Sequence, residues 1–138
     1  REAAMFGVFG GHVNVSDGRY VYMRAPASEA NQPLHEYTLM PTHMTKPFSV
    51  EELRTTKLAP PFAFTKGCPV NRIDATAAHG VNAHQFGTLL FDLQNDPQQE
   101  NPIQDEAVEK RMIGLLLQLM QENDAPQEQY ERLGLPVP

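Results

Sequence analysis

The sequence predicts an α+β fold: a small antiparallel β-sheet of about four strands, packed with one long C-terminal helix and short helices. Alternating apolar runs flank Asp17-Gly18, a strongly apolar segment covers residues 86–93, and residues 106–122 carry apolar side chains at three- and four-residue spacing. The chain has 138 residues, 41% of them hydrophobic, which is enough for one modest core. We therefore expect a single domain over residues 1–138.

The first strands should form a β-hairpin. Asp17-Gly18 favours a type I′ turn, in which both central residues need positive φ. That turn would place Val15 opposite Tyr20, and side chains would then alternate between the two faces of the sheet. One face would carry Val13, Val15, Tyr20 and Tyr22, and the other His12, Asn14, Val21 and Met23.

The middle of the chain should be mostly irregular, with two short elements. Residues 36–40 predict a short strand. Ser49 and Glu52 form a capping-box pattern, which predicts a helix that runs to about Leu58. Pro69 interrupts residues 62–73, and we expect no regular structure there.

The last third predicts a strand and two helices. Residues 86–93 are apolar enough for a central strand, and Asp105 is the expected N-cap of a helix over 106–122. Pro126 can begin a final short helix, with Gly134 as its stop. The apolar stripe of the long helix is wide, so we expect it to be covered on more than one side, and part of this apolar surface to meet a partner. Its members are Val108, Met112, Leu115, Leu116 and Leu119, widened by Ile113, Leu117 and Met120.

The charge balance argues against two kinds of partner. Eleven Lys and Arg residues against 17 Asp and Glu give a net charge of −6, with no basic cluster, so we expect neither nucleic-acid nor anionic-membrane binding. No apolar run approaches the roughly 20 residues of a membrane span. The chain begins Arg1-Glu2-Ala3 without an initiator Met, so we expect an internal fragment whose targeting signal cannot be read.

Three stretches, in order along the chain, resemble the C-terminal region of bacterial sulfatases. Residues 91–101 read Phe-Asp-Leu-Gln-Asn-Asp-Pro-Gln-Gln-Glu-Asn, which is similar to the sulfatase signature of Tyr-Asp-Leu, two residues, Asp-Pro, then Glu and Asn. The helix at 106–122 follows where those enzymes carry their C-terminal helix. Residues 1–4 together with 9–20, and residues 37–44, resemble the same region. Turn chemistry explains the residue types of the signature, because Asp92 can accept hydrogen bonds from turn amides and Asp-Pro fixes the exit toward the helix.

The resemblance spans nearly the whole chain and implies the alkaline-phosphatase-like superfamily. There, a C-terminal subdomain with an antiparallel sheet of about four strands and a helix packs beside a large catalytic domain. By this resemblance the chain is the non-catalytic C-terminal subdomain of an enzyme that hydrolyses sulfate esters. It would support the missing N-terminal catalytic domain and border the substrate cleft, and the substrate would be a sulfated small molecule or glycan.

The resemblance also implies that the parent enzyme uses Ca²⁺ or Mg²⁺ together with a formylglycine. Two other readings stay open: a stand-alone interaction or dimerisation module, and the C-terminal part of a phosphonate or phosphate ester hydrolase of the same superfamily. Homo-oligomerisation stays open, as does location, whether periplasmic, secreted or cytoplasmic in a bacterium.

The sulfatase chemistry itself is not expected in this segment, so we assign no catalytic residue. The only cysteine lies in Cys68-Pro69-Val70-Asn71-Arg72, where Val70 stands at the place of the Pro in Cys/Ser-x-Pro-x-Arg. A lone Cys is more often a small buried residue than a nucleophile. No Asp-Asp pair occurs, and the five scattered histidines lack zinc-ligand spacing, so we expect neither a metal site nor a cofactor here.

Three residues are candidates for contact with an anionic substrate: His12, His43 and Lys66. Sulfate esters are negatively charged, so cations and hydrogen-bond donors in ordered loops are the residues of interest. His12 follows Gly10-Gly11, which indicates a bulge or a close backbone approach. The alternative for all three is a polar side chain that is hydrogen-bonded locally.

Overall fold

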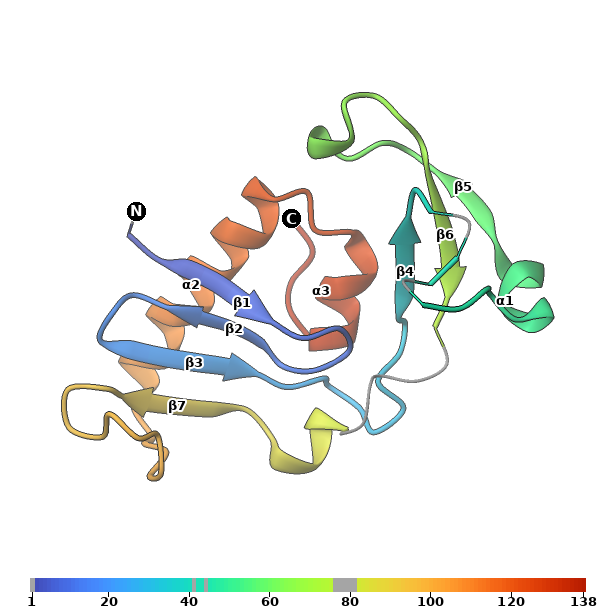
Figure 1. The fold of residues 1–138 in the computed structure, drawn as a ribbon. Coiled ribbons are helices and arrows are strands. Elements are labelled where there is room, and N and C mark those ends of the chain that lie inside the picture. The colour runs from blue at the N-terminus through green and yellow to red at the C-terminus, as the bar shows by residue number, and fades with distance from the viewer. Residues whose placement is uncertain (1, 41, 44, 76–81) are drawn as a thin grey trace.

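The computed structural model describes residues 2–40, 42, 43, 45–75 and 82–138, and the predicted α+β class is confirmed. A four-stranded antiparallel sheet, in the order β1-β2-β3-β7, lies against α2 and α3, and a separate three-stranded sheet, β4-β6-β5, stands beside them (Figure 1). The elements of the larger layer are β1 (Ala4–Gly7), β2 (Val13–Ser16), β3 (Tyr20–Arg24), β7 (Leu89–Asp92), α2 (Glu106–Glu122) and α3 (Gln127–Leu133). Within the described ranges, no helix is both long and apolar enough to cross a bilayer.

The β2–β3 hairpin is confirmed, but its predicted register is wrong by two residues. Val15 lies opposite Tyr22 rather than Tyr20. The turn forms one residue later than expected, because Gly18 takes the first central position with φ 93°, as a type II′ turn requires. Asp17 Oδ1 holds this turn by accepting hydrogen bonds from the backbone N–H groups of residues 19 and 20 at 2.9 and 2.7 Å. A two-residue shift leaves every side chain on its predicted face.

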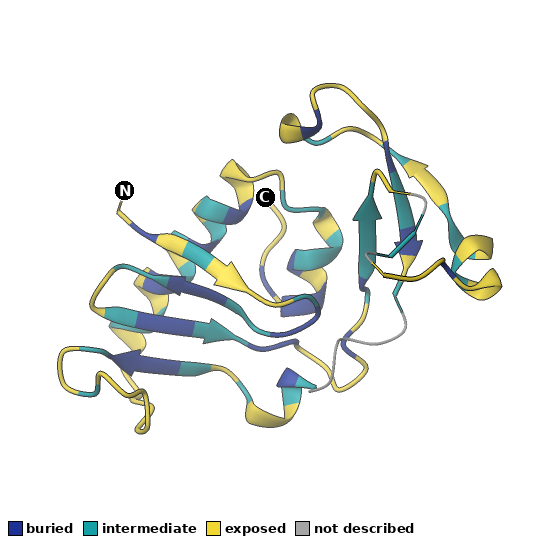
Figure 2. Ribbon diagram, viewed as in Figure 1, coloured by how far each residue is buried: buried dark blue, intermediate teal, exposed yellow. Residues whose placement is uncertain are grey.

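The main core lies between the four-stranded sheet and α2. The helix has the predicted bounds, and the Asp105 side chain caps it by accepting from the N–H groups of residues 107 and 108. Figure 2 shows the buried side of the sheet running along β2, β3 and β7, while much of β1 is exposed. The buried side chains that form this core include Val15, Tyr22, Leu90, Met112, Leu116, Met120, Tyr130 and Leu133. The rest of the predicted helix stripe is partly buried around them.

Strand β7 is an edge strand, so its predicted central position is wrong. Among the described strands it pairs only with β3, and residues 83–86 before it form a short 3₁₀ helix, η2 (Ala83–Phe86), instead of extending the strand. The segment that leads to α2 covers the free edge in part, because the Ile103 N–H donates to Leu90 O at 2.7 Å. That contact helps explain why an edge strand can be this apolar.

The turn after β7 has the structural role predicted for residues 91–101. Asp92 is buried and accepts from Arg19 through both carboxylate oxygens, from the Gln94 N–H and from the Asn95 side chain. Asp96 Oδ2 accepts from the N–H of residue 101 at 2.8 Å. These bonds fix the path from β7 toward α2.

The three-stranded sheet was not predicted. Its strands are β4 (His35–Thr38), β5 (Lys57–Ala59) and β6 (Val70–Asp74). The capping box at Ser49 is present, but α1 (Val50–Thr55) ends before the expected Leu58, because residues 57–59 pair with β6. Strand β6 lies in the region expected to be irregular, after a 3₁₀ turn, η1 (Ala63–Thr65).

Candidate functional site

The loop between β1 and β2 is held in one shape by hydrogen bonds from three directions. The Gly11 N–H donates to Val8 O at 3.0 Å, and Gly10 adopts φ 70°, so the predicted close approach at the glycine pair is confirmed. A Cβ on Gly11 would lie only 2.8 Å from the Val8 side chain. The side chain of Asn31 donates to Gly10 O at 2.7 Å, and that of Arg132 donates to Gly11 O at 3.2 Å.

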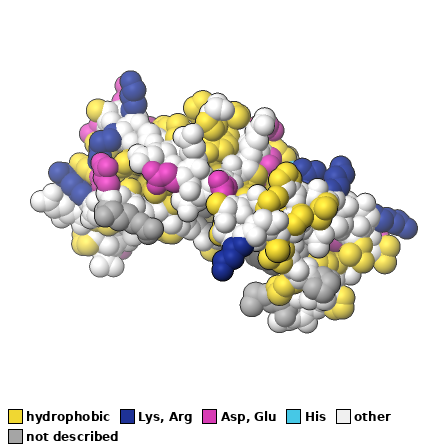
Figure 3. All heavy atoms as spheres, turned by 90° about the horizontal axis from the view of Figure 1, so that it is seen from above, with side chains coloured by type: hydrophobic (Ala, Val, Ile, Leu, Met, Phe, Trp, Pro, Cys, Tyr) yellow, Lys and Arg dark blue, Asp and Glu magenta, His cyan; other side chains and the backbone are white. Residues whose placement is uncertain are grey.

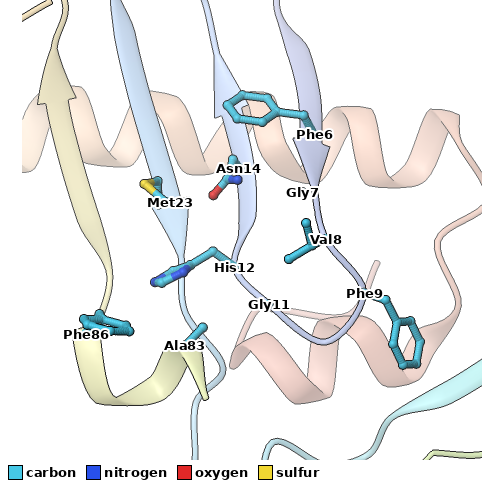
Figure 4. A pocket seen from close by; sticks show the side chains of 10 residues that line it. All are labelled: Phe6, Gly7, Val8, Phe9, Gly11, His12, Asn14, Met23, Ala83 and Phe86. Atoms are coloured by element: carbon cyan, nitrogen blue, oxygen red, sulfur yellow. The ribbon is translucent and has the colours of Figure 1, made fainter. Parts of the chain in front are cut away.

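His12 ends this loop and lies on the sheet face that points away from α2. Its Nε2 contacts Gly87 O at 2.8 Å, which links the loop to the segment before β7. Beside it is an open hollow of about 460 Å³, here called the sheet-face hollow, bordered by aromatic and aliphatic side chains. Figure 4 shows Phe6, Asn14, Met23 and Phe86 around His12 on this face.

Asn14 is the unusual polar group in the sheet-face hollow. The residue is 7% exposed, and its Oδ1 atom has no hydrogen-bond partner in the described part of the chain. A buried acceptor without a donor costs about 1–3 kcal/mol. Asn14 Oδ1 is therefore an unpaired acceptor buried at this face, near the His12 ring.

His43 belongs to a second group of residues, around β4. Its Nε2 lies 2.8 Å from Glu52 Oε1 and its Nδ1 3.5 Å from Glu36 Oε2. The ring packs edge-on against Phe48, with 4.5 Å between centroids. Hydrogen bonds to the Ser49 backbone and then to His43 hold the pKa of Glu52 at about 2, so this carboxylate is ionised at neutral pH.

His35, which lies on β4, is also placed between two carboxylates. Its Nδ1 lies 3.1 Å from Glu128 Oε1 and its Nε2 3.2 Å from Asp74 Oδ1. The Tyr37 hydroxyl donates to the same Glu128 oxygen. Burial, and then this bond to Glu128, raise the pKa of Tyr37 above its ordinary value, so the phenol stays protonated and remains a donor. Glu128 thus links α3, which packs against the four-stranded sheet, to β4 of the three-stranded sheet.

Lys66 lies apart from the two candidate histidines. It is exposed, takes φ 53° at the end of η1, and borders neither the sheet-face hollow nor the hollow beside His43. His12 and His43 border different hollows, but Phe9 lines both, so the β1–β2 loop lies between them. The three candidates do not converge on one ligand position.

Cys68 is exposed, so the expectation of a buried cysteine is wrong. Its backbone groups bond to Thr65, which closes the turn after η1. Within the described residues, no three His, Cys, Asp or Glu side chains come together in a way that could hold a metal ion. A Ca²⁺ or Mg²⁺ site therefore does not fit these side chains. His79, one of the five histidines, lies outside the described residues.

Arg132 is the residue that sequence reasoning missed. It lies in α3, is 3% exposed, and has no carboxylate partner among the residues described. Its Nε donates to Gln129 Oε1 at 3.0 Å and its Nη1 to Asn31 Oδ1 at 2.9 Å as well as to Gly11 O. Burial lowers the pKa of Arg132 to about 10, so the guanidinium still carries its charge at pH 7. A charged residue on a short helix normally indicates a solvent-exposed position, and nothing in the sequence pointed the other way.

On the face shown in Figure 3, Lys and Arg side chains are scattered among apolar and acidic groups. No protein-family model, no curated protein and no solved structure matches the chain.

Proposed function

We propose that this chain is the non-catalytic C-terminal subdomain of a sulfatase, which supports the catalytic domain and borders the substrate cleft with its β1–β2 loop. The proposal starts from the three ordered stretches that resemble sulfatases. The turn chemistry of Asp92 and Asp96 gives residues 91–101 a physical reason for their composition. A four-stranded antiparallel sheet with a C-terminal helix is also what that resemblance implies.

The observation that carries most weight is the open face of the four-stranded sheet. One face is covered by α2 and α3, whereas the opposite face holds the sheet-face hollow. Phe6 and Phe86 at its border are 50% and 57% exposed, and Val8 is 77% exposed. Adjacent large apolar side chains in water favour contact with a partner. A catalytic domain packed here would cover them.

A division of roles follows for the parent enzyme. Formylglycine and a divalent cation would supply the attack on sulfur from the catalytic domain, outside this chain. The β1–β2 loop would present His12 as a hydrogen-bond partner for the part of the substrate that is not cleaved, at a position fixed by Gly87.

The test uses the whole parent protein, with 4-nitrophenyl sulfate as substrate in the presence of Ca²⁺ or Mg²⁺. Phe86→Asp places a charge in the sheet-face hollow and should lower both turnover and the thermal stability of the parent. Phe64→Asp is the matched control, because Phe64 is 74% exposed and does not border that hollow. Equal effects of the two substitutions would contradict the docking face.

The same assay separates the alternatives. A parent that hydrolyses a phosphonate or phosphate ester but no sulfate ester would support the related hydrolase. A 138-residue chain that dimerises through the sheet-face hollow, and does not bind the rest of the parent when both are expressed together, would support the stand-alone module.

A further inference from the structure

Another hollow lies between the β1–β2 loop, β4 and α3. It measures about 390 Å³, within the range of small-molecule sites, and we call it the Arg132 hollow. Most of its wall is apolar, formed by side chains such as Met5, Phe9, Val13, Leu34 and Pro126. Its polar side chains are Arg132, Gln129, His12, His35 and Tyr37. No described Asp or Glu lines it, although the chain as a whole is acidic.

The guanidinium of Arg132 is incompletely satisfied at this hollow. Nε and Nη1 donate to neutral oxygens of Gln129, Asn31 and Gly11, but Nη2 has no hydrogen-bond partner in the described chain. Glu128, four residues before Arg132 on the same helix, is engaged by His35 and Tyr37 instead. Removing a cation from water without a counter-ion is costly, so an anion that reaches Nη2 would gain a strong charge-assisted hydrogen bond.

We propose that the Arg132 hollow binds a small amphiphilic organic anion, with its oxyanion on Arg132 Nη2 and its apolar body against the wall formed by the β1–β2 loop and Leu34. The apolar lining favours an aromatic or aliphatic body over a free inorganic ion, because such an ion would leave the wall uncovered. The single guanidinium can bind one sulfonate, sulfate or carboxylate group. This site does not depend on the parent being a sulfatase.

The probe is 2-naphthalenesulfonate, and 2-naphthalenesulfonamide is its neutral counterpart with the same ring system. Binding to the full chain is followed by NMR through the Arg132 Nε–H signal and the amide signals of Gly10 and Gly11. We expect the sulfonate to bind about tenfold or more tightly than the sulfonamide, because a hydrogen bond between charged groups is lost in the neutral compound. Inorganic sulfate should bind more weakly than the sulfonate.

Gln129→Glu is the decisive variant. Gln129 Oε1 already accepts from Arg132 Nε, so a carboxylate of the same shape would supply the missing counter-ion without removing a contact. We expect affinity for the sulfonate to fall about tenfold and the unfolding midpoint to rise or stay unchanged. Gln98→Glu adds the same charge at an exposed turn and should leave binding unchanged.

Three results would overturn the site: no shift of the Arg132 Nε–H signal at high probe concentration, equal binding of sulfonate and sulfonamide, or equal affinity of Gln129→Glu and wild type. The sulfatase proposal is tested separately by turnover of the parent. A parent without sulfate-ester hydrolysis would therefore leave sulfonate binding to Arg132 standing.

Discussion

Replacing Glu128 with Gln tests whether α3 holds the two sheets together. Glu128 Oε1 accepts from the Tyr37 hydroxyl and from His35 Nδ1, and both donors lie on β4. The amide oxygen of Gln can still accept one hydrogen bond, so the substitution removes the charge and one charge-assisted bond. The Glu128 side chain is 13% exposed, and we expect the free energy of unfolding at pH 7 to fall by about 1–2 kcal/mol.

Urea unfolding followed by circular dichroism measures this loss. With a slope of about 2 kcal/mol per molar urea, the midpoint should fall by about 0.5–1 M. Glu131→Gln is the control, because Glu131 is an exposed acid on the same helix and should change stability by less than about 0.5 kcal/mol. A midpoint for Glu128→Gln equal to that of Glu131→Gln would refute the role assigned to this joint.

The same pair of proteins should differ less at low pH. Burial acts to raise the pKa of Glu128, but hydrogen bonds from Tyr37, from the backbone and from His35 outweigh burial, so the pKa lies below its ordinary value. A carboxylate with a depressed pKa in the folded state stabilises the protein fully above its unfolded pKa, and loses that contribution as pH falls through the folded value. The stability gap between wild type and Glu128→Gln should therefore be largest above the pKa that Glu128 has in the unfolded chain, and shrink as pH falls through the lowered pKa of the folded state. A gap independent of pH would contradict this assignment.

Three further outcomes can be checked with simple variants. Leu116→Ala should lower the free energy of unfolding by about 2–5 kcal/mol in urea, because the side chain is fully buried against the sheet; a loss below about 1 kcal/mol would contradict that packing. Gly134→Ala should lower the free energy of unfolding by about 1–2 kcal/mol, because Gly134 has φ 61° and an added Cβ would lie 3.1 Å from Ala27 Cβ. Gly114→Ala, where an added Cβ would meet open space on α2, should raise the free energy of unfolding by about 0.5–1 kcal/mol. A higher melting temperature for Gly134→Ala than for Gly114→Ala would be inconsistent with this backbone. The isolated chain should not hydrolyse 4-nitrophenyl sulfate with added Ca²⁺ or Mg²⁺, and metal-dependent turnover abolished by Cys68→Ala would overturn the non-catalytic role.

Local chemistry made part of the fold predictable. The cap at Asp105, the capping box at Ser49 and the stop at Gly134 each depend on residues within one turn of the helix end, so the sequence contains the whole interaction. The hairpin was predictable for the same reason. Its register was not, because one glycine beside Asp17 is compatible with two turn types whose last paired residues differ.

The second sheet escaped prediction because β6 lacks the alternation of a half-buried strand. Its two well-buried apolar residues, Val70 and Ile73, are three positions apart, and polar residues stand between them. Such a strand is stabilised by its neighbours β4 and β5 on both sides and not by an apolar face of its own. The end of α1 depends on the same pairing, which is why the helix was predicted too long.

Of the candidate site, only the constrained loop could be predicted from the sequence, because glycines mark it. Gly10-Gly11 indicated a constrained loop before His12, and that loop is present. Arg132 could not be foreseen, because it is 121 positions from Gly11 and 101 positions from Asn31, and only the tertiary fold brings these groups together.

These contacts connect the Arg132 hollow to the sheet-face hollow. In the Gly10-Gly11 turn, Gly10 lines the Arg132 hollow and Gly11 borders the sheet-face hollow, and His12 borders both. Arg132 and Asn31 hold the turn on one side, and the contact of His12 with Gly87 holds it on the other. An anion that draws the guanidinium away from Gly11 would therefore weaken one of the bonds that position His12. If a catalytic domain docks at the sheet-face hollow, an anion bound in the Arg132 hollow would affect that interface through Gly10, Gly11 and His12, three consecutive residues of one loop.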